Sequence, residues 1–273
     1  MERQNPRRGT GVVARRACAI ACAALALAVV QPATADVVEP DGRATPTAQE
    51  RAALNALGVV YPDGGLGGTA FLVGDCDVLV TAKHTVFDRA GRPRADRFLY
   101  YPMNGDHAIE ALLPGSMAGN GSGETADWVV MRLAEPDTGC RPLTVAAVGG
   151  AELLARAEAR FDSAGFHADL GGELMISRGC TIVAACRDAA LSSAVFTHDC
   201  DTDVGASGSP LFAASPAGVT VFGMHIRGHG PGADICSRSN LALRIDGAFH
   251  DAIGQMIAAP AAPGPRRRHP GER

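Results

Sequence analysis

The chain has 273 residues, of which 47% are hydrophobic and 20% are charged. These are ordinary values for a globular protein and exclude disorder throughout. The formal net charge is −4, but residues 1–35 and 259–273 together hold nine Arg and two Glu, which leaves 16 cationic and 27 anionic residues between them. Because so acidic a body repels nucleic acid and anionic membranes, we expect neither as a partner.

The first 35 residues have the pattern of an export signal. Five Arg precede an apolar stretch from Ala17 to Val30, and Ala33-Thr34-Ala35 fits the small-x-small pattern of a cleavage site. The apolar stretch is too short to span a membrane, which takes about 20 residues. We therefore expect residues 1–35 to be removed as a signal peptide, with the cut before Asp36. The protein is then secreted or periplasmic, with no membrane insertion after signal removal.

The cysteines agree with export. After removal of residues 1–35, six remain: Cys76, Cys140, Cys180, Cys186, Cys200 and Cys236. An even number in an exported chain predicts up to three disulfides, although six cysteines allow 15 pairings. No CxxC spacing occurs among these cysteines, so the sequence favours disulfides over a zinc site. We expect no metal ion and no cofactor.

Along the chain, residues 46–57 predict a short helix with Thr45 as its cap and Pro46 in its first turn. The short apolar or alternating runs that follow, separated by Gly, Asp, Asn and Pro, predict antiparallel β-sheets or barrels. These runs are residues 69–73, 78–81, 127–133, 173–177, 194–197 and 219–224. We expect a surface loop at 115–125, a boundary between two halves near 141–152, an amphipathic helix at 245–257, and a disordered basic tail at 258–273.

The segment Gly205-Ala-Ser-Gly208 is the sharpest candidate for chemistry. A serine between small residues can lie on a tight turn, where its hydroxyl is accessible and nearby backbone N–H groups are free. Acyl transfer needs an attacking oxygen and donors aimed at the developing oxyanion. Ser207 is therefore a candidate nucleophile, and the N–H groups of Gly205 and Ser207 form a candidate oxyanion hole. Taken alone, the segment fits a Gly/Ser-rich loop as well.

Two upstream segments supply the partners that such a serine needs. An apolar run ends in Thr81-Ala-Lys-His84, and Asp127 enters another apolar run. A carboxylate beside an apolar strand is costly to bury unless it is hydrogen-bonded, and an imidazole is a suitable partner. The order His84, Asp127, Ser207 argues against an α/β-hydrolase, in which the serine comes first and the histidine last.

Together the three segments resemble those of the chymotrypsin-like (trypsin-fold) serine proteases, over roughly residues 58–257. The resemblance implies an all-β fold of two six-stranded antiparallel β-barrels, the first in residues 58–145 and the second, with a C-terminal helix, in residues 146–257. It leaves residues 36–57 as an N-terminal segment that is either kept or removed as a pro-segment. It also implies that Cys200 bonds Cys180 or Cys236, and that Cys76 bonds Cys140.

The resemblance assigns Ser207 as nucleophile, His84 as the base that takes its proton, and Asp127 as the group that orients the imidazole. Thr202 and His225 most resemble the substrate-binding pair of bacterial glutamyl endopeptidases, which would bind an acidic side chain before the cut. Asp201, six residues before Ser207, leaves open a preference for a basic residue before the cut. The third alternative is a preference for neither acidic nor basic residues.

These observations predict a secreted serine endopeptidase that hydrolyses peptide bonds through an acyl-enzyme intermediate. Its partner is a protein or peptide substrate, and we expect a monomer. A catalytically inactive binding protein with the same fold is the alternative, and a secreted esterase is a third interpretation. Peptide cleavage distinguishes the first interpretation from the other two.

Overall fold

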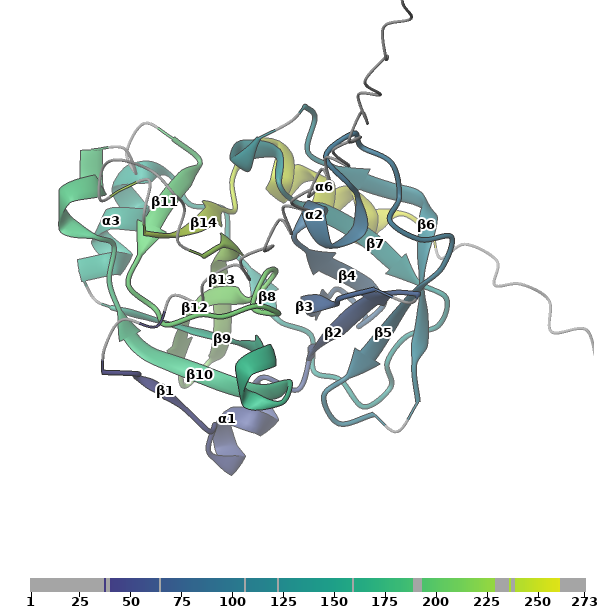
Figure 1. The fold of residues 1–273 in the computed structure, drawn as a ribbon, viewed down its shortest axis with the longest axis horizontal. Coiled ribbons are helices and arrows are strands. Elements are labelled where there is room, and N and C mark those ends of the chain that lie inside the picture. Colours follow the sequence, from purple (N-terminus) through teal and green to yellow (C-terminus); the bar gives the residue numbers. More distant parts are fainter. Residues whose placement is uncertain are drawn as a thin grey trace, which may run out of the picture. The chain divides into compact units, whose positions relative to one another are not determined.

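The structure is a computed structural model that describes residues 37, 40–63, 65–105, 107–121, 123–158, 160–188, 193–228, 236 and 239–260 (Figure 1). The expected signal peptide at residues 1–35 lies outside the described residues, as does all of the expected tail beyond residue 260. Within the described part, no helix has the length and apolar character needed to cross a membrane.

The N-terminal segment forms a short strand and a short helix, β1 (Arg43–Ala44) and α1 (Ala48–Ala53). The helix begins later than the sequence predicted, because Thr47 and not Thr45 is its cap. The Thr47 side chain accepts from the Glu50 N–H while the Glu50 carboxylate accepts from the Thr47 N–H, which satisfies two free donors of the first turn. Leu54, directly after the helix, is buried in the core.

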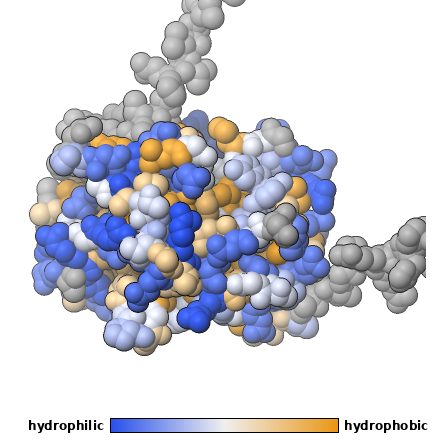
Figure 2. Space-filling view, turned by 90° about the horizontal axis from the view of Figure 1, so that it is seen from below, coloured by the Kyte–Doolittle hydropathy of each residue, from blue (hydrophilic) through white to orange (hydrophobic). Residues whose placement is uncertain are grey.

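The lower side of the molecule in Figure 1, where α1 and β1 lie, is the face drawn in Figure 2. Hydrophilic side chains cover much of this face, and hydrophobic ones are scattered among them in small groups.

The first barrel is a closed antiparallel sheet of six strands in the order β2-β3-β4-β7-β6-β5. Its strands are β2 (Leu57–Pro62), β3 (Gly68–Val73), β4 (Val78–Thr81), β5 (Phe98–Pro102), β6 (Ile109–Ala118) and β7 (Val129–Leu133). The side chains of Phe71, Leu79 and Met131 are fully buried in its core. The loop expected at 115–125 is shorter than predicted, since β6 continues to Ala118 before the short 3₁₀ helix η1 (Glu124–Ala126).

The second barrel has six antiparallel strands in the order β10-β9-β12-β13-β14-β11. They are β9 (Phe161–His167), β10 (Glu173–Cys180), β11 (Val195–His198), β12 (Pro210–Ser215), β13 (Gly218–Arg227) and β14 (Asn240–Arg244). A bridge between Ile182, which follows β10, and His198 of β11 joins the two ends of this order. Outside it, β1 pairs with β10, and β8 (Thr144–Val145) runs parallel to β13. The fold class predicted from the sequence is therefore confirmed.

Helices occupy the connections. They are α2 (Lys83–Val86), α3 (Gly150–Glu158), η2 (Ala168–Leu170), η3 (Ala184–Cys186) and the C-terminal α6 (Gly247–Ala258). The last one packs on the first barrel, where the ring of Phe249 stacks on Trp128 with the centroids 4.9 Å apart. Arg132 of β7 pairs with Asp77 and donates to the carbonyl oxygen of Met256, near the end of α6. The C-terminal helix expected from the sequence is thus present and tied to the first barrel.

Three disulfides join the six cysteines in pairs. Cys76 bonds Cys140 in the first half of the chain, Cys180 bonds Cys200, and Cys186 bonds Cys236. Of the two partners that the resemblance implied for Cys200, the structure has Cys180. This bond lies beside the isolated bridge of Ile182 with His198, so it adds a covalent link where the two ends of the strand order meet.

Candidate active site

His84 lies at the carboxyl end of a buried strand. The chain leaves β4 at Thr81 and turns at once into α2, whose first turn is held by the Thr85 hydroxyl donating to the Ala82 carbonyl (2.6 Å). Next to His84, the Lys83 ammonium donates to the carbonyl oxygens of Gly119 and Gly121, at 2.7 and 3.2 Å. The short helix is thereby fixed against the loop that leads to Asp127.

Asp127 contacts His84 twice. Its Oδ1 accepts from the backbone N–H of His84 at 2.9 Å, and its Oδ2 lies 2.7 Å from the ring Nδ1. The residue follows η1 directly and precedes β7, the strand paired with β4, so the two elements that carry His84 and Asp127 are neighbours in the sheet. Two contacts from one carboxylate fix both the position and the orientation of the imidazole.

Ser207 comes from the second barrel, on the loop between β11 and β12. Its Oγ lies 2.9 Å from His84 Nε2. Two glycines shape the turn, since Gly205 and Gly208 have φ of 97° and 93°, where other residues are strained. A Cβ at Gly208 would also lie 2.0 Å from the Thr69 carbonyl oxygen, so the turn fits against β3 only with glycine there.

The backbone next to Ser207 leaves two donors free. Gly205 is held by its carbonyl oxygen, which accepts from both the N–H and the hydroxyl of Thr69, each at 2.9 Å. Among the described residues, the N–H groups of Gly205 and Ser207 have no hydrogen-bond acceptor. Two free N–H groups beside an activated hydroxyl form the arrangement that stabilises an oxyanion.

Solved structures provide the comparison for this fold and geometry. A Glu endopeptidase solved in complex with MPD has 18% identity and a TM-score of 0.62, over 82% of this chain and 100% of that one. The protease Anisep from Arthrobacter nicotinovorans has 16% identity and a TM-score of 0.57, over 76% and 98%. The thermostable serine protease AL20 from an extremophilic microorganism has 16% identity and a TM-score of 0.56, over 77% and 100%.

The chain has the chymotrypsin-like fold. No protein-family model matches it, and no curated protein matches its sequence. Because identities below 25% establish only the fold, the chemistry must be argued from the side chains of this chain.

Thr202 and His225, the expected substrate-binding pair, are both buried, and His225 lies beside the turn that carries Ser207. The backbone of His225 bonds that of Gly208 and Ser209, and its Nδ1 lies 3.1 Å from the Nε2 atom of His198. Thr202 donates its hydroxyl to Oδ1 of Asn240. Burial lowers the pKa of His225 well below its ordinary value, so its imidazole is neutral at pH 7.

Asp201 is occupied by the N-terminal segment. Its Oδ2 accepts the backbone N–H of Gly42 at 2.6 Å, and its own carbonyl oxygen accepts the Ser177 hydroxyl at 3.0 Å. The side chain is buried. A carboxylate committed in this way is not placed as a free anion for a basic substrate.

The sequence missed the roles of two histidines. Sequence alone places His107, His167, His198 and His229 in loops, as structural or solvated residues. In the structure, His167 and His198 each end a strand and are buried. Burial lowers the pKa of each to about 4. His107 is exposed in a connection, and the expected loop position of His229 lies outside the described residues. A single histidine carries no local signal of a distant partner, so these contacts were not predictable.

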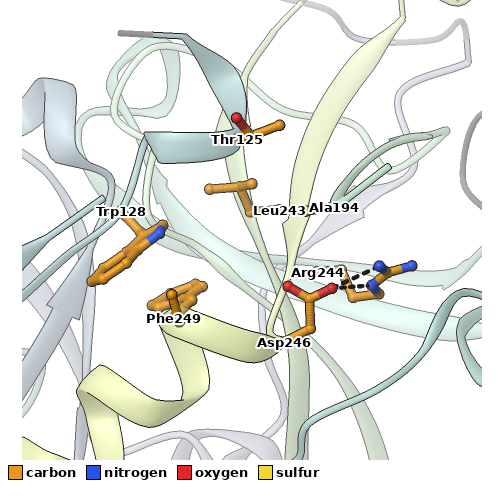
Figure 3. A pocket seen from close by; sticks show the side chains of 8 residues that line it. Thr125, Trp128, Ala194, Leu243, Arg244, Asp246 and Phe249 are labelled. Atoms are coloured by element: carbon orange, nitrogen blue, oxygen red, sulfur yellow. Dashed lines mark hydrogen bonds and ion pairs between the residues drawn. The ribbon is translucent and has the colours of Figure 1, made fainter. Parts of the chain in front are cut away.

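A small pocket lies between η1, β14 and the start of α6 (Figure 3). The stacked rings of Trp128 and Phe249 line one side, and the ion pair of Arg244 with Asp246 (2.6 Å) lines another. His84, Asp127 and Ser207 are not among its lining residues. The pocket therefore lies beside the segment that carries Asp127 and does not include the candidate catalytic side chains.

Proposed function

We propose that this protein is a serine endopeptidase in which His84, Asp127 and Ser207 form the catalytic triad. The observation that carries the proposal is the continuous chain of contacts from Asp127 Oδ2 through the two ring nitrogens of His84 to Ser207 Oγ, at 2.7 and 2.9 Å. The free N–H groups of Gly205 and Ser207 support it, because they are the donors that acyl transfer requires.

In this mechanism Ser207 Oγ attacks the carbonyl carbon of the substrate while its proton passes to His84 Nε2. The negative charge that forms on the carbonyl oxygen is stabilised by the N–H groups of Gly205 and Ser207. Asp127 keeps the Nδ1 proton in place and stabilises the imidazolium. His84 then gives its proton to the leaving amine, and the acyl group stays on Ser207.

Deacylation repeats these steps with water. His84 takes a proton from a water molecule, the resulting hydroxide attacks the acyl carbon, and the bond to Ser207 Oγ breaks as His84 returns the proton to that oxygen. The free enzyme is regenerated, and the oxygen of the water ends in the released carboxylate. The resulting reaction is hydrolysis of a peptide bond in two half-reactions.

An extended peptide can reach this site along β13. The ladder between β12 and β13 begins at the pair Pro210–Met224, and β13 continues to Arg227 past the nucleophile. Past Met224 the backbone of His225 still bonds that of Gly208 and Ser209, and beyond His225 no described strand pairs with the edge of β13 that faces β12. A substrate chain that adds to this edge gains backbone hydrogen bonds and is held in register with Ser207.

We further propose a preference for an acidic residue before the cut, with Thr202 and His225 as the binding pair. Nε2 of His225 is available to donate to a carboxylate, since only Nδ1 is engaged by His198 among the described residues. Thr202 adds a hydroxyl, currently bonded to Asn240. The bond of Asp201 to Gly42 argues against a basic preference. That one structural neighbour is a Glu endopeptidase agrees with this choice.

Cleavage of a mixed peptide library by residues 36–273 tests the proposal. New termini read by mass spectrometry are expected with the wild type and with the control variant Ser215→Ala, which changes the exposed serine at the end of β12, and absent with Ser207→Ala. Acidic residues are expected before the cuts. An inactive, correctly disulfide-bonded wild type would refute the enzyme and favour the binding protein. Cuts after basic or neutral residues would refute only the specificity.

We also propose that the protein is exported and that residues 1–35 are removed in the process. The three disulfides support this, because such bonds persist in oxidising compartments. Sequencing the N-terminus of protein recovered from the medium or the periplasm is expected to start at Asp36.

A further inference from the structure

We propose that Arg43 is a positioning residue for the oxyanion hole, acting through the loop that carries Gly205. The inference rests on the proposed function above. Two segments are involved: the N-terminal brace, residues 41–44, and the oxyanion loop, residues 201–207. The brace contacts the oxyanion loop directly and also through η2, which packs against it.

The guanidinium of Arg43 is almost completely buried and surrounded by acceptors. Only 3% of the side chain is exposed. Its two terminal nitrogens donate to both oxygens of Asp169 at 2.9 and 2.6 Å, and its Nε donates to Asp41 at 3.0 Å. Nη1 also lies 3.2 Å from His167 Nδ1. Paired, planar contacts of this kind fix geometry as well as charge.

Asp169 and its neighbour connect this cluster to the oxyanion loop. The N–H of Asp169 donates to Oδ2 of Asp203 at 3.2 Å, and the N–H of Ala168 donates to the Val204 carbonyl at 2.8 Å. Asp203 and Val204 directly precede Gly205. A shift of η2 would therefore move the peptide that presents the first oxyanion donor.

The brace also contacts the loop without an intermediary. Gly42 N–H donates to Asp201 Oδ2 at 2.6 Å, and Arg43 pairs with Ser177 of β10, whose hydroxyl donates to the Asp201 carbonyl at 3.0 Å. Both ends of the segment from Asp201 to Val204 are thus held by elements that the brace orders. The residue before the nucleophile is Ala206, which has no charged group for holding the loop from within.

Charge explains why Arg43 is needed at this place. Asp203 is close to Asp169, and burial together with that neighbour raises the pKa of Asp203, while Arg43 holds the pKa of Asp169 at about 2. Without the guanidinium, the carboxylate of Asp169 faces those of Asp41 and Asp203 with no cation beside it. Their repulsion would separate η2 from the oxyanion loop and withdraw the support of Gly205.

The test compares Arg43→Ala with Arg178→Ala. Arg178 also joins the N-terminal segment to β10, through Glu50 at 2.7 Å, but it does not contact the oxyanion loop. Each variant is assayed for kcat, KM and the Kd of phenylboronic acid, whose tetrahedral adduct on the nucleophile needs the oxyanion hole. Removing one oxyanion donor outright costs about 10²–10³ in kcat, so a displaced one is expected to cost at least about tenfold.

For Arg43→Ala we expect the loss in kcat, with KM little changed and phenylboronic acid bound more weakly by a similar factor. For Arg178→Ala we expect all three within about twofold of wild type, even if its thermal stability falls. Should Arg43→Ala fail to fold, Arg43→Lys, which keeps the charge but loses the paired contact with Asp169, is expected to show the same pattern more weakly.

A second variant tests the charge argument. Asp169→Asn in the Arg43→Ala background removes one of the repelling carboxylates and is expected to recover part of kcat. The proposal is overturned if the Arg43 variants match Arg178→Ala in kcat and in boronate affinity. An inactive wild type would instead overturn the proposed function, so the two failures are distinct.

Discussion

At the scale of single residues, Asp127 determines which nitrogen of His84 carries the proton. Its carboxylate can only accept, so Nδ1 must donate to it and Nε2 is left to accept from Ser207. Asp127→Asn keeps the shape but can present its amide N–H to Nδ1, which reverses the tautomer. We expect kcat to fall by about 10⁴. Steady-state kinetics of peptide cleavage measure kcat, and Asp88→Asn, in an exposed turn, is the control. An Asp127→Asn variant with the kcat of the wild type would contradict the prediction.

In the proposed acidic preference, His225 acts through Nε2, the ring nitrogen that His198 does not contact. Replacing it with Gln is expected to reduce the preference for Glu over Gln substrates by about tenfold or more, because a carboxylate loses its buried donor. The measurement is the ratio of kcat/KM for two peptides that differ only in that residue. His250→Gln on α6 is the control. An unchanged ratio in His225→Gln would place the acidic preference elsewhere.

The three residues of the proposed triad are recognisable in the sequence, and the residues that contact their surroundings are not. His84, Asp127 and Ser207 each lie in a local pattern of small or apolar residues, so the three segments are recognisable without the fold. Arg43 and His198 have no such pattern. Arg43 contacts Asp169, 126 positions away in the chain, and only the pairing of β1 with β10 brings them together.

At the scale of elements, the strands that the sequence located best are those that are buried at every position. β3 and β4 are buried at every position and were identified within one residue, because burial on both faces leaves a continuous apolar sequence. β1 and β8 are two residues long and form only because a neighbouring strand offers free backbone groups. Their sequences carry no periodicity, so they depend on the tertiary fold.

One ion pair joins the two barrels next to the proposed peptide-binding edge. Glu124 of η1 lies three residues before Asp127, Arg227 ends β13, and the two side chains are 2.8 Å apart and partly exposed. An exposed pair contributes at most about 1 kcal/mol to stability. We expect Arg227→Gln to unfold at nearly the wild-type urea concentration but to change KM for peptides more than kcat, because the substrate passes this side chain.

The control for that pair is Arg187→Gln, which breaks the exposed contact of Arg187 with Glu158 (3.1 Å) in the second half of the chain. It is expected to leave both KM and kcat unchanged. If Arg227→Gln behaves in the same way, the peptide does not run along the end of β13.

At the scale of the whole molecule, buried histidines make the fold sensitive to acid. Burial lowers the pKa of His167 and His198 to about 4 and that of His225 well below 6.5, whereas in the unfolded chain all three titrate near 6.5. Between pH 6.5 and 4 the unfolded state therefore binds more protons than the folded state. The free energy of unfolding must decrease as the pH falls through this range, by roughly 1 kcal/mol per pH unit for each histidine.

Glu50 and Asp169, whose pKa values are lowered the most, do not offset this loss in the same window. The pKa values of Glu50 and Asp169 are held at about 2 by Arg178 and Arg43, so their contribution is complete above about pH 4.5 and is lost only in stronger acid. Urea unfolding of the disulfide-bonded protein at pH 7, 6, 5 and 4.5 is expected to show a steady decrease. His198→Gln should reduce that slope and His250→Gln should not. A free energy of unfolding that is constant from pH 7 to 4.5 would mean that the histidines are hydrated in solution.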